Sequence, residues 1–305
     1  MDLKKLLPLL GITIFLYLIF LIGPDKIIAA VLSANPALLF VALLFVIPIT
    51  MLQAFKWFLL VKQQGLKISF FEILKIYFIG LFYGAVTPGK IGSFIRISYL
   101  SKKTAKPISF CASSVFLDRI ADILSIFLIS LFGFFVFIKI FTDTLLSVAV
   151  FVIGLLVLLF FFSRKTKVVL SFLLAKIIPT NFKEKSGEMI QNFYSSFPSK
   201  RQRLVLVLLS LTAWLLVFIQ AYIVATAFGI NVPFFDFIGL VALSSVIGLL
   251  PVTINGHGTT EAALILFFSL FGVAAGNVFV FSVVDSLMLT YLTAFIGFLF
   301  SLKNR

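Results

Sequence analysis

Long apolar segments separated by short polar ones form the main pattern of this sequence. Apolar windows of about 18 or more residues without a charge recur, and an α-helix of that length crosses a hydrocarbon core about 30 Å thick. We therefore predict six membrane-spanning helices, at 6–22, 36–61, 108–138, 142–162, 204–228 and 276–302. The ten-residue alternation of a transmembrane β-barrel is absent from the sequence, so the pattern predicts an all-α, polytopic transmembrane helical bundle.

Two further apolar regions, 70–99 and 236–271, are interrupted near their middles by proline and glycine. Neither reads as one clean span. We predict that each is a re-entrant hairpin, which enters and leaves by the same face of the membrane. The alternative is that these prolines and glycines merely kink ordinary helices.

The distribution of basic residues supports one orientation. With the N-terminus inside, most of the 25 lysines and arginines fall in inside segments, whereas the outside keeps only Lys26 and Lys139. By the positive-inside rule, we expect an integral protein of the inner membrane with both termini in the cytoplasm. The same charges would attract anionic cytoplasmic lipid, and they explain the formal charge of +14 without a nucleic-acid partner.

The predicted topology contains an internal repeat. A helix, an interrupted hairpin and a helix occupy 36–138 and recur over 204–302, with the two hairpins entering from opposite sides. The halves are joined by a spanning helix and a basic cytoplasmic segment, 163–203, so that 1–305 forms a single transmembrane domain. Such inverted repeats are common in secondary transporters, where the interrupted segments mark the substrate site.

Composition excludes several classes of function. Hydrophobic residues make up 62% of the chain and charged residues 12%, which leaves little sequence for a separate catalytic module. The single cysteine, Cys111, forms no internal disulfide and is expected to be a helix-packing residue. HExxH, CxxC and Walker-type patterns do not occur in the sequence, so we expect no metal, no cofactor and no enzymatic activity.

The first break carries the segment TPGKIGSFIR, residues 87–96. Thr87 is a helix-capping residue, and Pro88 suits the first helical position, so we predict that a short helix begins at Thr87. Gly89 and Gly92 leave the backbone open to close approach. The free N–H groups of a helix start at membrane depth favour an anion.

Two basic residues add positive charge to this break. Lys90 lies within it and Arg96 closes it. Because arginine holds a phosphate or carboxylate through two parallel hydrogen bonds, we predict that Arg96 binds a lipid phosphate.

The second break, LLPVTINGHGTTEAAL at 249–264, has the same combination of a proline with closely spaced glycines. These residues are Pro251, Gly256 and Gly258. A new helix is predicted to start at Thr259 or Thr260, with Glu261 in its first turn. A glutamate there compensates the helix dipole, but at membrane depth it also needs a partner or water. His257 either relays a proton or is a plain hydrogen-bonding residue.

Other charged residues lie within the predicted membrane segments: Lys56, Asp118, Arg119, Asp122 and Asp285. A charge at the centre of a spanning helix costs about 2.5–3.5 kcal/mol, so each must pair or face a water-filled cavity. Asp118 and Asp122 share one helix face, and Arg119 can reach Asp122. We expect Lys56 and Arg96 to line a headgroup cavity, with Glu261 and Asp285 lining its opposite half.

The segments TPGKIGSFIRISYL, FLDRIADIL at 116–124 and LLPVTINGHGTTEAAL resemble the lysylphosphatidylglycerol synthase transmembrane family. This family is the flippase-like membrane domain of the multiple peptide resistance factor, and the likeness spans nearly the whole chain. Asp118 stands where the family usually has glutamate, and Lys56 stands where it has arginine. The spacing around Val252 to Asn255 also departs from the family pattern.

The resemblance implies movement of a polar-headed lipid across the bilayer. Aminoacylated phosphatidylglycerol, polyprenyl-phosphate-linked lipids and other phospholipids or glycolipids are compatible substrates, and a homo-oligomer is compatible as well. The sequence shows no aminoacyltransferase domain, so we expect no lipid synthesis. Two alternatives stay open: a headgroup transferase or hydrolase with Glu261 or Asp118 as base beside His257, and a non-transporting partner of a lipid or glycan biosynthetic enzyme.

Overall fold

The computed structural model describes residues 3–141, 163, 191, 197–249 and 253–303. The regular structure of this part of the chain is helical throughout, which confirms the all-α class. The predicted span 142–162, most of the basic segment 163–203 and Pro251 lie outside the described residues.

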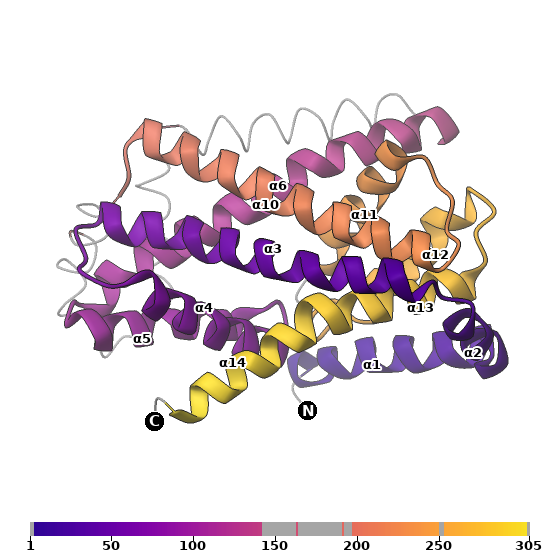
Figure 1. Cartoon of the computed structure of the whole chain (residues 1–305), viewed down its shortest axis with the longest axis horizontal. Coiled ribbons are helices and arrows are strands. Elements are labelled where there is room, and N and C mark those ends of the chain that lie inside the picture. The colour runs from indigo at the N-terminus through magenta and orange to yellow at the C-terminus, as the bar shows by residue number, and fades with distance from the viewer. Residues whose placement is uncertain (1–2, 142–162, 164–190, 192–196, 250–252, 304–305) are drawn as a thin grey trace.

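The chain begins with two helices that meet at a sharp bend (Figure 1). Helix α1, Leu3–Ile22, contains the predicted first span, and α2, Pro24–Leu32, was not predicted. The helix axes are bent by 81° at Gly23, whose φ of 91° suits glycine, and Pro24 occupies the first position of α2. Both helices contact the C-terminal half, α1 against α12 and α2 against α13.

The first half then forms a long helix, an interrupted pair of shorter helices and a second long helix. Its helices are α3, Pro36–Gln63, α4, Phe70–Ala85, a 3₁₀ turn at Ile91–Phe94, α5, Ile95–Thr104, and α6, Ile108–Phe141. Asn35 begins α3 by accepting hydrogen bonds from two backbone N–H groups, and Ser69 caps α4 by accepting one, from the Glu72 N–H. The predicted region 70–99 is therefore interrupted, as expected.

The second half follows the same order. Its helices are α10, Lys200–Ala227, α11, Phe234–Gly248, α12, Thr259–Ser269, α13, Ala275–Ser286, a π-helical turn at Leu287–Tyr291, and α14, Leu292–Lys303. Ser199 and Gln202 form a capping box at the start of α10. Helix α12 starts at Thr259, as predicted from the sequence.

Three helices of the described part are long and apolar enough to cross a membrane: Pro36–Gln63, Lys200–Ala227 and Ala275–Lys303. The bent pair α1 and α2 provides a fourth if it counts as one span. Large apolar side chains also lie uncovered on the surface, with Phe20 83% and Phe235 76% exposed. Such surfaces are expected where lipid, not water, is the solvent.

The halves interlock through reciprocal helix pairs. Helix α3 packs along α10, α4 packs against α14, and α11 packs against α6. The two breaks also meet, since Pro88 and Ile254 form an antiparallel backbone bridge. This arrangement brings segments that lie far apart in the sequence to one place in the interior.

Candidate functional site

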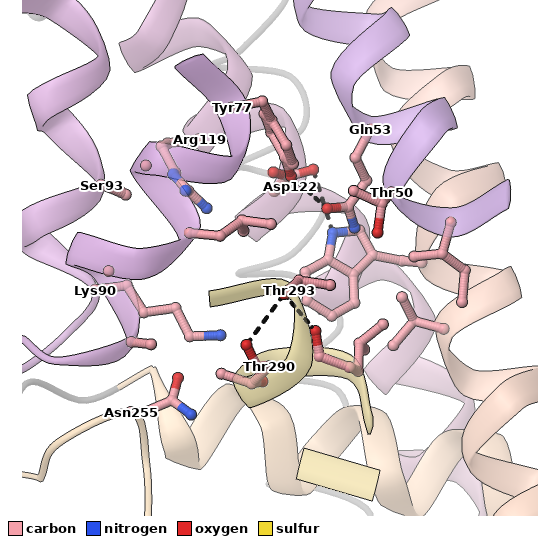
Figure 2. A pocket seen from close by; sticks show the side chains of 18 residues that line it. Thr50, Gln53, Tyr77, Lys90, Ser93, Arg119, Asp122, Asn255, Thr290 and Thr293 are labelled. Atoms are coloured by element: carbon pink, nitrogen blue, oxygen red, sulfur yellow. Dashed lines mark hydrogen bonds between the residues drawn. The ribbon is translucent and has the colours of Figure 1, made fainter. Parts of the chain in front are cut away.

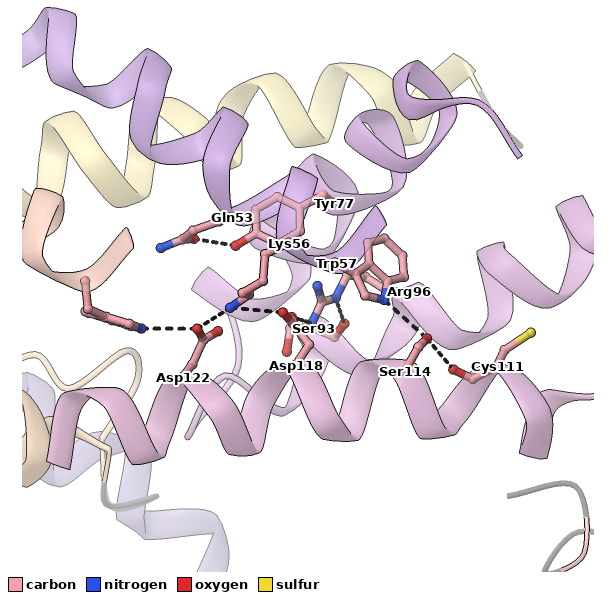
Figure 3. Close-up of polar contacts among 11 residues, drawn as sticks. Gln53, Lys56, Trp57, Tyr77, Ser93, Arg96, Cys111, Ser114, Asp118 and Asp122 are labelled. Carbon is pink, nitrogen blue, oxygen red and sulfur yellow. Dashed lines mark hydrogen bonds and ion pairs between the residues drawn. The ribbon is translucent and has the colours of Figure 1, made fainter. Parts of the chain in front are cut away.

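A buried ion network joins α3 to α6 (Figure 3). Lys56 Nζ lies 3.0 Å from Asp118 Oδ1 and also donates a hydrogen bond to Asp122 Oδ1. The side chains of Lys56 and Asp118 are each 1% exposed. Asp118 and Asp122 therefore share one helix face, as predicted, and they share one lysine.

Arg96 completes the network from α5. Its Nη2 atom donates to Asp118 Oδ2 at 3.0 Å, and its Nε atom donates to the Ser93 carbonyl at 3.3 Å. The guanidinium also lies over the rings of Trp57 and Tyr77, 4.8 and 5.2 Å from their centroids. With 0% of its surface exposed, Arg96 is enclosed by protein.

Two acids and two bases thus balance within the network. Removing charges from water is costly, and mutual attraction offsets that cost only when the geometry and the hydrogen bonds are good. Asp122 gains a further donor, because Trp214 Nε1 of α10 lies 3.2 Å from its Oδ1 atom. The network therefore ties α3, α5 and α6 of the first half to α10 of the second half.

Trp214→Phe is expected to destabilise the protein by about 1.5 kcal/mol, because it removes a hydrogen bond to a charged acceptor. Thermal unfolding in detergent would measure the loss. In an Asp122→Asn background, the same substitution should cost less, since the acceptor is then neutral. An equal cost in both backgrounds would show that Trp214 acts through packing alone.

A cavity of about 90 Å³ lies beside the network, between the two halves (Figure 2). Its polar lining residues are Thr50, Gln53, Tyr77, Lys90, Ser93, Arg119, Asp122, Asn255, Thr290 and Thr293. They come from α3, α4, α6, both breaks and the C-terminal helix, which is π-helical at Thr290. Single π turns within helices are frequent at functional sites.

Two basic side chains point into this cavity from the first half, Lys90 and Arg119 (Figure 2). The local pair between Arg119 and Asp122 that the sequence suggested is not formed, because Asp122 faces Lys56 and Trp214 instead. Within the described residues, neither Lys90 nor Arg119 has an ion pair or a side-chain hydrogen bond, and the Arg119 Nε atom is buried without a partner. The cavity therefore holds two uncompensated positive charges.

The backbone of the first break explains how Lys90 reaches the cavity. Thr87 Oγ1 donates to the Tyr83 carbonyl at 2.8 Å and accepts the Gly92 N–H at 2.7 Å. Gly89 and Lys90 adopt left-handed conformations, with φ of 58° and 56°. The prediction of a helix start at Thr87 is wrong, because this turn delays the helix until Ile91.

In the second break, a chain of hydrogen bonds runs from Gly258 to Tyr291. Glu261 Oε2 accepts the Gly258 N–H at 2.6 Å, and Glu261 Oε1 lies 2.9 Å from His257 Nδ1. His257 Nε2 lies 2.7 Å from the Tyr291 hydroxyl and 3.4 Å from Asn255 Nδ2. Glu261 is thus committed to its own helix start and to His257.

Several expected site residues lie away from the cavity. Lys56, Arg96, Asp118, Glu261 and Asp285 do not line it. Asp285 lies near Gln220 of α10. Within the described residues, Asp285 Oδ1 and both polar atoms of the Gln220 amide are buried without a hydrogen-bond partner. Arg96, expected to hold a phosphate, is closed off from the cavity by its partners. The neutral network and the positive cavity are therefore distinct groups of side chains that meet at Asp122.

Glycines of both breaks allow close backbone approach. A Cβ atom on Gly92 would overlap the Tyr83 carbonyl, and one on Gly256 would lie 3.1 Å from Gly248 Cα and the Gly248 carbonyl oxygen. Gly256 and Gly258 also have positive φ, at 83° and 88°. No group of three or more His, Cys, Asp or Glu side chains is placed to hold a metal ion within the part of the chain that the structure describes.

Sequence reasoning missed most of the polar lining, including Gln53, Trp214, Asn255 and Thr290. Each is uncharged, and a neutral polar residue on an apolar helix carries little signal of its own. The best available clue was Gln53, an amide three residues before Lys56 in an otherwise apolar run. Its side chain accepts a hydrogen bond from Tyr77, which also lines the cavity.

The helical fold, its lipid-facing surface and its buried charges define an integral membrane protein. The model of the lysylphosphatidylglycerol synthase transmembrane region matches residues 9–297, so the chain belongs to this family. A UPF0104 membrane protein of Pyrococcus horikoshii is 24% identical, with 99% of this chain and 97% of the relative covered. A UPF0104 membrane protein of Methanocaldococcus jannaschii is 26% identical, with 91% and 88% covered.

Proposed function

We propose that this protein moves a lipid with an anionic headgroup across the inner membrane. The single observation that carries the proposal is the pair Lys90 and Arg119, two basic side chains without partners among the described residues, facing one cavity between the halves. An unpaired charge at membrane depth is costly, so an anion that enters the cavity supplies the counter-charge that Lys90 and Arg119 lack and is bound there. The acyl chains stay in lipid.

The reciprocal helix contacts support an inverted repeat with re-entrant hairpins. In such a repeat, α3 corresponds to α10, α4 to α11, and α6 to the helix that ends in α14. The first hairpin helix of each half packs against the last helix of the other half, α4 on α14 and α11 on α6. A two-fold rotation that superimposes one half on the other would turn the contact of α4 with α14 into the contact of α11 with α6, as in a self-complementary interface.

Alternating access follows from this architecture. Rocking one half against the other would open the cavity first to one face and then to the other. The bridge between Pro88 and Ile254 lies where the halves would separate. The sequence has no nucleotide-binding motif, so we propose that uphill movement uses an ion or proton gradient.

Arg96 has a different role in this proposal from the one that the sequence suggested. It is a positioning residue, because it holds Asp118, and Asp118 and Asp122 together hold Lys56. Asp122 Oδ1 accepts from Lys56 and Trp214, and among the described residues the carboxylate forms no ion pair with Arg119. The network thereby keeps Arg119 free for a ligand.

Leaflet exchange in liposomes tests the function. The purified protein, reconstituted with a fluorescent anionic phospholipid, should accelerate the exchange of that lipid between leaflets. Arg119→Gln should slow the exchange by about tenfold, the loss expected for one charged hydrogen bond. Lys103→Gln, at a surface lysine 46% exposed, is the matched control and should leave the rate unchanged. Equal rates in Arg119→Gln and wild type would refute the assigned site.

A headgroup transferase or hydrolase is the second candidate, and the chain Tyr291–His257–Glu261 favours it. The Tyr291 hydroxyl lies 2.7 Å from His257 Nε2, and His257 Nδ1 lies 2.9 Å from Glu261 Oε1. A hydroxyl next to a base that a carboxylate orients is the arrangement used in nucleophilic catalysis. Mass spectrometry of the same liposomes distinguishes the candidates, because an enzyme would convert the lipid. Absence of both exchange and conversion would favour a non-transporting partner of a biosynthetic enzyme.

The proposed orientation is tested with single cysteines in a Cys111→Ala background. Lys26 and Lys103 are exposed, and they fall on opposite sides of the predicted topology. In right-side-out membrane vesicles, a membrane-impermeant maleimide should label Lys26→Cys and spare Lys103→Cys. Inside-out vesicles should give the reverse. Labelling of both from one side would contradict cytoplasmic termini.

A further inference from the structure

We infer that the central cavity selects a doubly charged phosphate, such as a lipid phosphomonoester or diphosphate, over a phosphodiester or an aminoacylated headgroup. This inference rests on the proposed function, and it names the substrate class of the same cavity. It follows from the balance of charges around the cavity, where the one lining carboxylate of the described residues already shares its charge with Lys56.

The charged side chains around the cavity carry an excess of two positive charges. Lys56 and Arg96 are balanced by Asp118 and Asp122 through contacts of 3.0 Å or less. Lys90 and Arg119 then remain, and within the described part of the chain no carboxylate pairs with either. A ligand with two negative charges restores neutrality, whereas a ligand with one leaves a positive charge enclosed.

Phosphate headgroups differ in their net charge and in the number of acceptor oxygens that they offer. A phosphomonoester carries a charge of about −1.5 to −2 at pH 7 and offers three acceptor oxygens. A phosphodiester carries one negative charge and two such oxygens. A phosphodiester that bears a lysyl ester is a net cation, which Lys90 and Arg119 would repel.

The cavity also offers little counter-charge for an amine. Asp122 is the one carboxylate among the lining residues of the described chain, and its Oδ1 atom already accepts hydrogen bonds from Lys56 and Trp214. Glu261 is bonded to Gly258 and His257 outside the cavity. An aminoacyl headgroup would therefore bring its ammonium group close to Lys90 and Arg119, with only the carboxylate that Lys56 already shares as a counter-charge.

Donors, in contrast, converge on the cavity. Arg119 offers a planar guanidinium, which suits two phosphate oxygens, and Lys90 offers a point charge. Thr290, which carries a hydroxyl, lies below them beside Asn255, whose Nδ2 atom is 3.4 Å from His257 Nε2 (Figure 2). Both halves thus supply groups that stabilise phosphate oxygens.

Binding is tested with lipids that differ only in the headgroup. Phosphatidic acid, phosphatidylglycerol and lysylphosphatidylglycerol with identical acyl chains would be titrated into the detergent-purified protein at pH 7, with native mass spectrometry as the readout. We expect phosphatidic acid to bind at least tenfold more tightly than either phosphodiester. At pH 5 this preference should shrink, because the phosphomonoester dianion takes up a proton at about pH 6 and becomes a monoanion. Equal binding, or preference for lysylphosphatidylglycerol, would overturn the inference.

The matched variants are Lys90→Gln, Arg119→Gln and the control Lys103→Gln. Each cavity variant should reduce the binding of phosphatidic acid about tenfold and that of phosphatidylglycerol by less, so that the preference itself falls. The control should retain the full preference. A preference that persists in the double variant Lys90→Gln/Arg119→Gln would place the selective site elsewhere.

Two further arms separate this inference from the proposed function. Leaflet exchange of phosphatidylglycerol faster than that of phosphatidic acid would support translocation and overturn the charge selectivity. Selective binding of phosphatidic acid without exchange of any lipid would support the selectivity and overturn translocation. Inorganic phosphate that binds as tightly as phosphatidic acid would support a dianion site and assign it to the free ion.

Discussion

Asp118→Asn is expected to destabilise the protein by about 3–5 kcal/mol, the usual cost of removing one partner from a buried ion pair. Asp118 accepts from both Lys56 and Arg96, and the side chains of all three are at most 1% exposed. The substitution leaves one uncompensated positive charge in a network whose side chains are almost fully buried. Thermal or denaturant unfolding in detergent micelles would measure the loss, and lower abundance in the membrane should accompany it.

A double variant distinguishes charge from shape. Arg96→Met/Asp118→Asn removes one charge of each sign and leaves the pair between Lys56 and Asp122 in place. It should therefore be more stable than Asp118→Asn alone, although it carries one more substitution. If the two changes added their costs, the network would not be held by charge, and the role assigned to Arg96 would fail.

Helix positions followed from hydropathy because membrane spans are long and uniform. The helices at 36–61, 108–138, 204–228 and 276–302 were all found, and their boundaries shifted by only a few residues. Helix α2 was missed because it is short and contains Asp25 and Lys26. Its direction depends on a backbone turn at Gly23, which periodicity does not reveal.

Predictions from neighbouring residues along the sequence failed where a side chain contacts residues far away in the sequence or bonds to the backbone in another way. Arg119 and Asp122 are close along α6, yet Asp122 binds Lys56, a residue 66 positions away, and Trp214, 92 positions away. Likewise, the Thr87 hydroxyl bonds to the Tyr83 carbonyl and the Gly92 N–H, so the capping pattern does not start a helix. The sequence indicated which charged residues lie in the interior, but long-range geometry decides which of them are paired.

Gly92→Ala is expected to impair both stability and lipid exchange, because the added Cβ atom would overlap the backbone carbonyl of Tyr83 and crowd Thr87 Oγ1. Overpacking of this kind costs about 1–3 kcal/mol, and occasionally more when the obstacle is backbone. The first break would have to move, and Lys90 moves with it. Unfolding in detergent and binding of phosphatidic acid would measure the two effects.

Gly276→Ala is the matched control. Gly276 lies within α13, has no positive φ, and a Cβ atom there would meet its nearest neighbour, the Lys26 carbonyl oxygen, at an ordinary 3.5 Å. Since alanine favours a helix over glycine by about 1 kcal/mol, this variant should be as stable as wild type or slightly more stable. A normal Gly92→Ala protein would mean that the first break relaxes without cost. The close approach of Gly92 to α4 would then be irrelevant to how Lys90 reaches the cavity.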